Sequence, residues 1–169
     1  KISTKIPILK NIMKIADHII IGGGMAFTFA KALGGKIGLS IHEDSMLETA
    51  KEILDSSKEN NVKIHLPIDV VCSLEFSNSS PRKIFDIMNI DNNFQGMDAG
   101  PKSLELFKNV VLNAKTILWN GPLGVFEFPN FSNGTKMLGK FISNSTKNGA
   151  FSLVGGGDSV SAVKKLNID

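Results

Sequence analysis

Two runs of three glycines, each at the end of an apolar segment, are the residues of this chain best suited to bind a phosphate. Gly22, Gly23 and Gly24 follow an isoleucine run, and a second triplet, residues 155–157, follows residues 151–154. Both patterns are typical of a strand, a tight turn and a helix. The first N–H groups of such a helix lack partners within it, and glycines without a Cβ let an anion approach them closely. The spacing predicts phosphate-binding turns, although one triplet alone is equally compatible with a structural turn.

Charged residues near these turns could complete a nucleotide site. Asp158 directly follows the second triplet, where it could cap the helix or give Mg²⁺ a hard oxygen ligand beside phosphate oxygens. Glu127 ends a third candidate loop, residues 119–127, and could accept from ribose hydroxyls or face water. Lys1 and Lys5 are four residues apart and share one helical face, although a solvated pair would have the same spacing.

Neither of the two common phosphate-binding fingerprints is present. The dinucleotide pattern G-x-G-x-x-G fails because its third glycine is replaced by Phe27 after the first triplet and by Val160 after the second. The Gly-Lys-Ser/Thr ending of a P-loop is also missing from the sequence. A nucleotide site in this chain must use another kind of phosphate-binding loop, and a dinucleotide-dependent oxidoreductase is disfavoured.

Composition narrows the classes of protein further. The 169 residues are enough for one domain, and the net charge of +3 comes from scattered Lys and Arg rather than a basic stripe. We therefore expect no nucleic-acid partner, and no apolar run is long enough to predict a membrane span. Cys72 is the only cysteine and lies in an apolar run, which favours a buried core thiol in a reducing compartment. His18, His42 and His65 lie in unrelated segments without metal-ligand spacing and are interpreted as structural or surface residues.

Alternating strands and helices are expected to position these loops. Helices are predicted over residues 4–15, 25–33, 45–59, 101–114, 132–145 and 159–166, and strands over residues 19–21, 62–66, 69–72, 116–119 and 150–154. Ser45 to Glu48 reads as a capping box, Ser132 as a helix cap, and residues 76–96 as irregular. This order is typical of a three-layer αβα, Rossmann-like parallel sheet, whose ligands bind at the carboxyl ends of the strands, where the glycine-bearing loops fall.

Five segments resemble, in order and spacing, motifs of the phosphoglycerate kinase family: residues 20–29, 66–69, 96–101, 119–127 and 155–159. The resemblance runs along the whole chain. It implies the C-terminal, nucleotide-binding domain of a two-domain fold, incomplete over residues 1–169 and without the N-terminal phosphoglycerate-binding domain.

The resemblance also implies an activity. The family uses Mg²⁺ and transfers a phosphoryl group reversibly between 1,3-bisphosphoglycerate with ADP and 3-phosphoglycerate with ATP, a step of glycolysis in the cytoplasm. This chain would supply the ADP/ATP site, would be inactive alone and would be a monomer. A nucleotide-binding module without a catalytic partner domain is the alternative.

Site residues follow from the same resemblance. Lys1 and Lys5 resemble the catalytic lysines that contact the nucleotide phosphates and the transferred group, and Lys5 also counts as nucleotide-binding. Asp158 resembles the Mg²⁺ ligand and Glu127 the acid that binds ribose. The other implied nucleotide-binding residues are Gly23, Gly24, Gly96 and Met97 around adenine, Pro122, Gly124 and Val125 along the nucleoside, and Asn120, Gly156, Gly157 and Ser159 near the phosphates. Residues 77–94 depart from the family pattern beside the adenine pocket.

Overall fold

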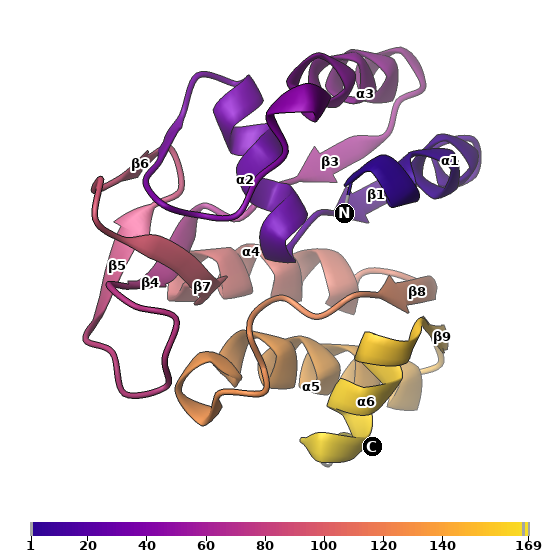
Figure 1. The fold of residues 1–169 in the computed structure, drawn as a ribbon. Helices are drawn as coiled ribbons and strands as arrows, with labels where there is room; N and C mark the ends of the chain where they lie inside the picture. The colour runs from indigo at the N-terminus through magenta and orange to yellow at the C-terminus, as the bar shows by residue number, and fades with distance from the viewer. Residues whose placement is uncertain (1, 167, 169) are drawn as a thin grey trace.

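The computed structural model describes residues 2–166 and residue 168 as a chain of alternating helices and strands (Figure 1). Its elements are α1 (Ile2–Ile12), β1 (His18–Ile20), α2 (Gly23–Ala32), β2 (Lys36–Ile37), η1 (Asp44–Met46), α3 (Leu47–Glu59), β3 (Lys63–His65), β4 (Asp69–Ser73), β5 (Arg82–Asp86), β6 (Asn89–Ile90), β7 (Gln95–Ala99), α4 (Pro101–Leu112), β8 (Thr116–Asn120), η2 (Pro129–Phe131), α5 (Asn133–Lys147), β9 (Phe151–Gly155) and α6 (Gly157–Lys165).

Two parallel strand pairs carry the predicted loops. β1 pairs with β3, and β8 pairs with β9 in a register that runs from the pair Thr116 and Phe151 to the pair Asn120 and Gly155. Because each pair is connected through helices, these are the crossover units that the alternating sequence predicts. Among the described residues the two pairs are separate ladders rather than one continuous sheet.

A three-stranded antiparallel sheet in the order β5-β4-β7 was not predicted. The prediction of an irregular segment over residues 76–96 is therefore wrong, because β5, β6 and the first two residues of β7 lie within it. β5 escaped detection because four of its five residues are exposed, so it has no apolar period. It is held by its antiparallel ladder to β4, which runs from the pair Asp69 and Asp86 to the pair Ser73 and Arg82.

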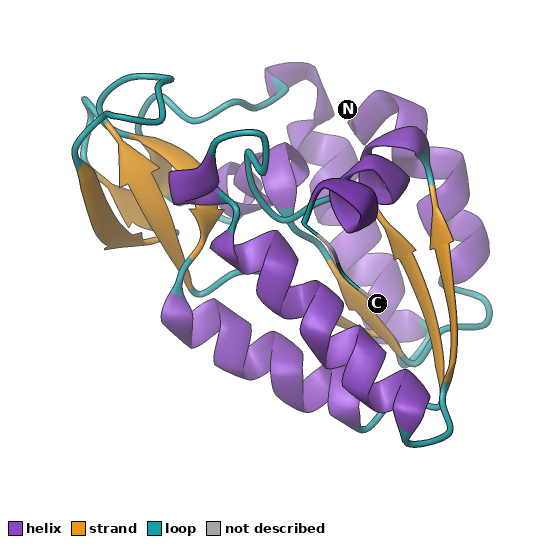
Figure 2. Ribbon diagram, turned by 90° about the horizontal axis from the view of Figure 1, so that it is seen from below, coloured by secondary structure: helices purple, strands orange, loops and turns teal. Residues whose placement is uncertain are grey.

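Two hydrophobic cores organise the helices. The first is built around Phe27 and Phe29 of α2, and the second around Phe107 of α4, Trp119 of β8 and Phe141 of α5. In Figure 1, α1, α2 and α3 lie near β1 and β3, while α5 and α6 lie near β8 and β9. Figure 2 shows the antiparallel sheet at one end of the molecule and the parallel strands at the other.

Helix starts differ from the local prediction. The prediction of a capping box over Ser45 to Glu48 is wrong, because α3 begins at Leu47 and its N-cap, Met46, makes no side-chain cap hydrogen bond. Ser132 does occupy the N-cap position of α5, but its hydroxyl donates to the Pro129 carbonyl at 2.8 Å. Caps for α4 and α5 come instead from distant aspartates.

Cys72 is fully buried, and burial raises the pKa of its thiol to about 12. A thiol with so high a pKa is protonated at neutral pH and inert, so the expected core role is confirmed. Within the described ranges, the helices lack the combination of length and apolarity that crossing a membrane requires.

Candidate functional site

The second glycine triplet forms the turn between β9 and α6. Gly156 has a φ of +83°, and a Cβ there would lie 2.9 Å from Asn120 Oδ1, so both the backbone angle and the close approach favour glycine. The turn is held against the end of β8 because the Gly121 N–H donates to Ser159 Oγ. α6 begins at Gly157, and its first N–H groups have no acceptor within the helix. This helix start therefore has the free donors and the open backbone that a phosphate needs.

Lys5 brings a positive charge to the same place. It lies in α1, half-buried, and its ammonium donates to Asn120 Oδ1 at 3.1 Å across 115 residues of sequence. The ladder pairs Asn120 with Gly155. A lysine, an amide and a helix start therefore converge at the carboxyl ends of β8 and β9.

Asp158 lies in the first turn of α6 with an exposed side chain. The N-cap of α6 is Gly156, so Asp158 is not the cap that the sequence allowed as an alternative. No cluster of three or more His, Cys, Asp or Glu side chains suited to a metal occurs among the described residues. One exposed carboxylate beside the open glycine turn fits Mg²⁺, which keeps several waters and is held by one or two carboxylates together with substrate phosphates.

The first glycine triplet lies against the loop that follows β8. Gly23 has a φ of +64°, and a Cβ on it would lie 3.2 Å from the Pro122 carbonyl oxygen. A Cβ on Gly24 would lie 2.8 Å from the side chain of Ile41, which is 72% exposed. The turn that opens α2 and the loop after β8 therefore lie against each other.

β7 and the loop after β8 form one packed unit. The Val125 N–H donates to the Met97 carbonyl at 2.9 Å, and a Cβ on Gly124 would lie 2.7 Å from the same oxygen. Gly96 lies directly against the ring of Phe27, which leaves no space for a side chain. The Met97 side chain is buried, so Met97 contacts the loop through its backbone.

Glu127 lies exposed beyond this unit. Lys165 of α6 donates to the Glu127 carbonyl oxygen at 3.2 Å and lies 5.9 Å from the centre of the Phe126 ring. Since Lys165 contacts the backbone, the Glu127 carboxylate stays accessible, which suits either of the roles that the sequence allowed.

Phe76 and Asn78, where the segment that departs from the family pattern begins, contact the residues after Glu127. The Asn130 N–H donates to Asn78 Oδ1 at 2.8 Å, its amide donates to the Asn78 carbonyl at 2.7 Å, and the rings of Phe76 and Phe128 are 5.0 Å apart. Phe76 and Asn78 therefore support the segment that follows Glu127.

Asp98 is a buried residue that sequence reasoning missed. Its carboxylate accepts from the Ala99 N–H at 2.9 Å and from the Gly134 N–H, in the first turn of α5, at 2.9 Å. It also lies directly against Gly124, leaving no space for a side chain there. Asp98 thus positions both the start of α5 and the loop at Val125. Burial raises the pKa of Asp98 to about 7, although the two backbone hydrogen bonds oppose this shift.

This raised pKa predicts a pH dependence of stability. Between its ordinary pKa of 3.8 and about 7, Asp98 binds more protons in the folded state than in the unfolded state. Relative to Asp98→Asn, the wild-type free energy of unfolding should therefore fall with rising pH between 5 and 7. The decrease should reach at most about 1.4 kcal/mol per pH unit. Urea unfolding of both proteins across this range measures it, and parallel pH profiles would contradict it.

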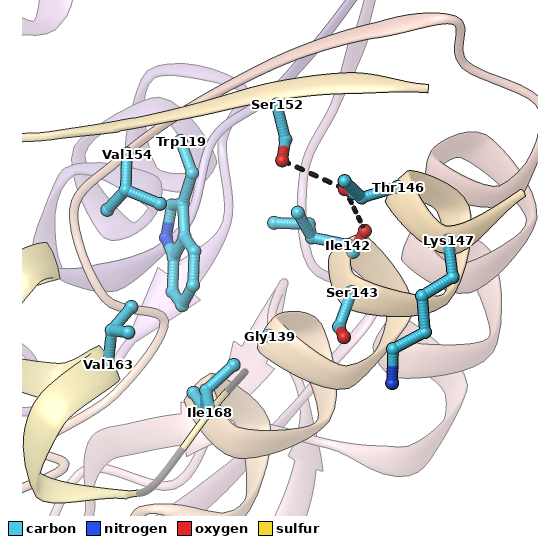
Figure 3. Close-up of a pocket in the computed structure, with 10 residues that line it drawn as sticks. All are labelled: Trp119, Gly139, Ile142, Ser143, Thr146, Lys147, Ser152, Val154, Val163 and Ile168. Atoms are coloured by element: carbon cyan, nitrogen blue, oxygen red, sulfur yellow. Dashed lines mark hydrogen bonds between the residues drawn. The ribbon is translucent and has the colours of Figure 1, made fainter. Parts of the chain in front are cut away.

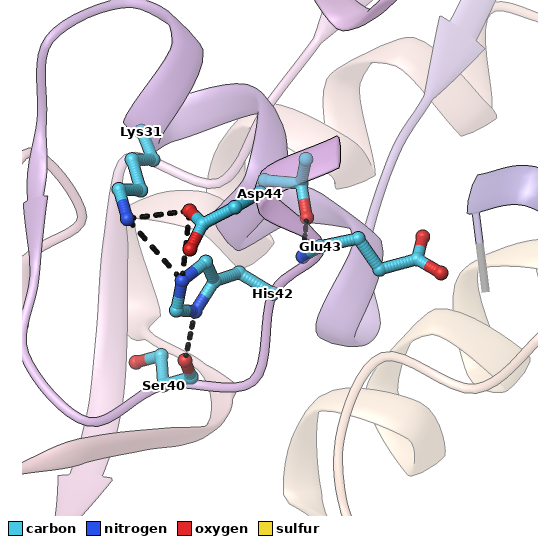
Figure 4. Close-up of polar contacts among 6 residues, drawn as sticks. Lys31, Ser40, His42, Glu43 and Asp44 are labelled. Carbon is cyan, nitrogen blue, oxygen red and sulfur yellow. Dashed lines mark hydrogen bonds and ion pairs between the residues drawn. The ribbon is translucent and has the colours of Figure 1, made fainter. Parts of the chain in front are cut away.

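The N-terminus of α1, and with it Lys5, is anchored by Glu43. Glu43 Oε2 accepts from the Ile2 N–H at 2.7 Å, and the Glu43 N–H donates to Thr28 Oγ1 at 3.0 Å. Figure 4 shows Glu43 beside a polar cluster in which Lys31 Nζ lies 2.6 Å from Asp44 Oδ1. The hydrogen bond from Lys31 lowers the pKa of Asp44. Sequence reasoning did not find Glu43, because its partners lie 15 and 41 residues away.

Lys1 lies outside the described residues, so its predicted role stays a prediction.

A mainly apolar cavity lies apart from the predicted site residues. It has a volume of about 480 Å³, lies between α5, β9 and α6, and is lined by Trp119, Ile142 and Val154 among others (Figure 3). None of the predicted nucleotide-binding residues lines this cavity, and its mainly apolar wall does not suit phosphate.

Parallel β/α units with glycine turns at the carboxyl ends of the strands define a Rossmann-like α/β domain. A sequence model of the phosphoglycerate kinase family matches residues 1–169, and the chain belongs to that family. Curated relatives named phosphoglycerate kinase from Porphyromonas gingivalis and Oenococcus oeni are each 49% identical to it over 168 residues. The alignments cover 99% of this chain but only 40% and 41% of those relatives.

Solved structures agree with the fold. The structure of phosphoglycerate kinase from Coxiella burnetii matches with a TM-score of 0.95 and 39% identity, over 99% of this chain and 42% of that one. Phosphoglycerate kinase from Pyrococcus horikoshii matches with a TM-score of 0.79 and 27% identity, over 98% of this chain and 42% of that one. The α/β, Rossmann-like fold class is confirmed, and the family is one of enzymes.

Proposed function

We propose that this chain is the nucleotide-binding part of a phosphoglycerate kinase and that it holds the phosphates of ADP and ATP. The observation that carries the proposal is the contact of Lys5 with Asn120, next to the Gly156 turn at the start of α6. Phosphoryl transfer requires the protein mainly to position the reactants and to neutralise charge on oxygen. A lysine and a row of helix N–H groups do both.

Each part of the site has a separate task. Lys5 is placed to contact the transferring group, and the first N–H groups of α6 are placed to donate to phosphate oxygens. Gly23, Pro122 and Val125 border the nucleoside, and Glu127 accepts from the ribose hydroxyls. When bound, Mg²⁺ would offset negative charge on the phosphate oxygens, with Asp158 as its protein ligand.

The phosphoglycerate side lies outside this chain. We propose that 3-phosphoglycerate and 1,3-bisphosphoglycerate bind to a further domain, that the 169 residues alone do not turn over, and that the protein acts as a monomer in the cytoplasm. The family relatives support this division, because the chain spans about 40% of their length.

A chimaera tests the proposal. Residues 1–169 replace the matched segment of the Porphyromonas gingivalis relative, and ADP formation that depends on 3-phosphoglycerate is followed. We expect turnover by the chimaera and none by the 169-residue chain. A folded chimaera that binds Mg-ADP without turnover would favour the alternative of a non-catalytic module, and turnover by the chain alone would contradict its inactivity.

Replacing Asp158 with asparagine should weaken binding of Mg-ADP by the chain about tenfold, because a hard anionic ligand is lost. Binding of ADP in the presence of EDTA should be unchanged. Calorimetric titration measures both affinities, and Asp55→Asn, at an exposed position of α3, is the matched control. Equal losses with and without Mg²⁺ would assign Asp158 a structural role.

A further inference from the structure

The parallel ladder between β1 and β3 brings two histidines together. The register pairs Ile20 with His65 and His18 with Lys63, and residues i and i+2 of a strand lie on one face. His18 and His65 are therefore diagonal neighbours on one face of the pair, although 47 residues separate them in the sequence. The sequence-based interpretation of unrelated histidines does not hold for these two.

Their rings meet nitrogen to nitrogen. His18 Nδ1 lies 2.9 Å from His65 Nε2, and the two ring planes differ by 19° with centroids 5.2 Å apart. One ring donates its N–H to the unprotonated nitrogen of the other, so the two nitrogens that face each other share a single proton. His18 is exposed and His65 is partly exposed, so solutes can reach the pair.

We propose that His18 Nδ1 and His65 Nε2 form a two-histidine site for a transition-metal dication such as Cu²⁺, Ni²⁺ or Zn²⁺. Nitrogen ligands bind Zn²⁺ at about 2.0–2.1 Å, so two neighbouring ligands on one ion are about 2.9–3.4 Å apart. The observed distance of 2.9 Å between His18 Nδ1 and His65 Nε2 lies at the lower end of that range. When the ion takes the place of the proton between the two nitrogens, that proton moves through solvent to the other nitrogen of the donor ring. Both imidazoles therefore stay neutral, and water fills the remaining positions of the ion.

The donor set selects the class of metal. Imidazole nitrogen suits Cu²⁺, Ni²⁺ and Zn²⁺, whereas Mg²⁺ prefers oxygen. Burial lowers the pKa of His65, followed by the nearby charges of His18 and Lys63, and this favours the neutral imidazole that binds a metal. The described residues add no third His, Cys, Asp or Glu ligand, so the site is an open, exchangeable one. It shares no residue with the proposed nucleotide site and does not depend on it.

Titration of the untagged 169-residue chain with NiCl₂ tests the site. We expect one Ni²⁺ ion per chain and an affinity that falls about tenfold or more in both His18→Asn and His65→Asn. His42→Asn, which removes a histidine outside the pair, is the control and should bind as the wild type does. A tenfold excess of MgCl₂ should not displace the Ni²⁺.

Thermal unfolding separates binding from folding. Since a ligand that binds only the folded state stabilises it, Ni²⁺ should raise the melting temperature of the wild type and of His42→Asn but not of the two variants of the pair. The absence of Ni²⁺ binding by the folded wild type would overturn the proposal. Wild-type affinity in both His18→Asn and His65→Asn would overturn it as well.

Discussion

Replacing Lys5 with methionine is expected to weaken Mg-ADP binding by the chain about 10- to 100-fold. Methionine keeps most of the apolar stem of the side chain but removes the ammonium that now contacts Asn120 Oδ1 at 3.1 Å. A hydrogen bond to a charged group contributes about 1.5–3 kcal/mol, and every 1.4 kcal/mol corresponds to a factor of ten. Calorimetric titration of wild type and variant measures the loss.

The same substitution should lower turnover of the chimaera further, about 100- to 1000-fold, because charge on the transferring group is greatest in the transition state. Lys10→Met is the matched control, since Lys10 is an exposed lysine in the last turn of the same helix. Equal binding and turnover in Lys5→Met and Lys10→Met would remove Lys5 from the site.

Replacing Asp69 with alanine is expected to lower the free energy of unfolding by about 3 kcal/mol. The buried carboxylate accepts from the Lys102 N–H at 3.1 Å and from the Ser103 N–H at 2.9 Å, in the first turn of α4. It also accepts from the Ser103 hydroxyl at 2.9 Å. Loss of a helix cap costs about 1 kcal/mol, and buried donors left without partners add about 1–3 kcal/mol.

Urea unfolding monitored by Trp119 fluorescence measures this loss. Asp69→Asn should be less destabilised, because one acceptor oxygen remains for α4. Asp86→Ala is the control: Asp86 Oδ1 accepts from the Met88 N–H at 2.8 Å in an exposed turn, and its loss should cost less than about 1 kcal/mol. A loss in Asp69→Ala no larger than in Asp86→Ala would contradict the capping role.

The turns of the site could be predicted because their signal is local. A strand, three glycines and a helix occupy adjacent residues, and α2 and α6 begin at Gly23 and Gly157, within the two triplets. The contact between Lys5 and Asn120 depends instead on how α1 packs. Only the resemblance to the family predicted that both residues belong to one site.

The helix caps could not be predicted because their signal is not local. Asp69 caps α4 from 34 residues away, and Asp98 reaches the Gly134 N–H across 36 residues. Both carboxylates lie in segments that the resemblance identified, but no periodicity relates them to the helices they serve. The local caps expected at Ser45 and Ser132 make no cap hydrogen bond.

β5 and the contact between His18 and His65 could not be predicted, because both depend on how the strands pair. β5 is mostly exposed and gains its order from the ladder to β4, so its own residues carry little strand signal. The contact of His18 with His65 requires the register of β1 on β3, and a shift of one residue would place the rings on opposite faces.

Calorimetric titration of the 169-residue chain with Mg-ADP, with NAD as the control, tests the central claim most directly. The account predicts one Mg-ADP site per chain, no binding of NAD, and loss of Mg-ADP affinity in Lys5→Met. A folded chain that bound neither ligand, or bound NAD as well as Mg-ADP, would contradict the claim that Lys5, Asn120 and the start of α6 form a phosphate-binding site.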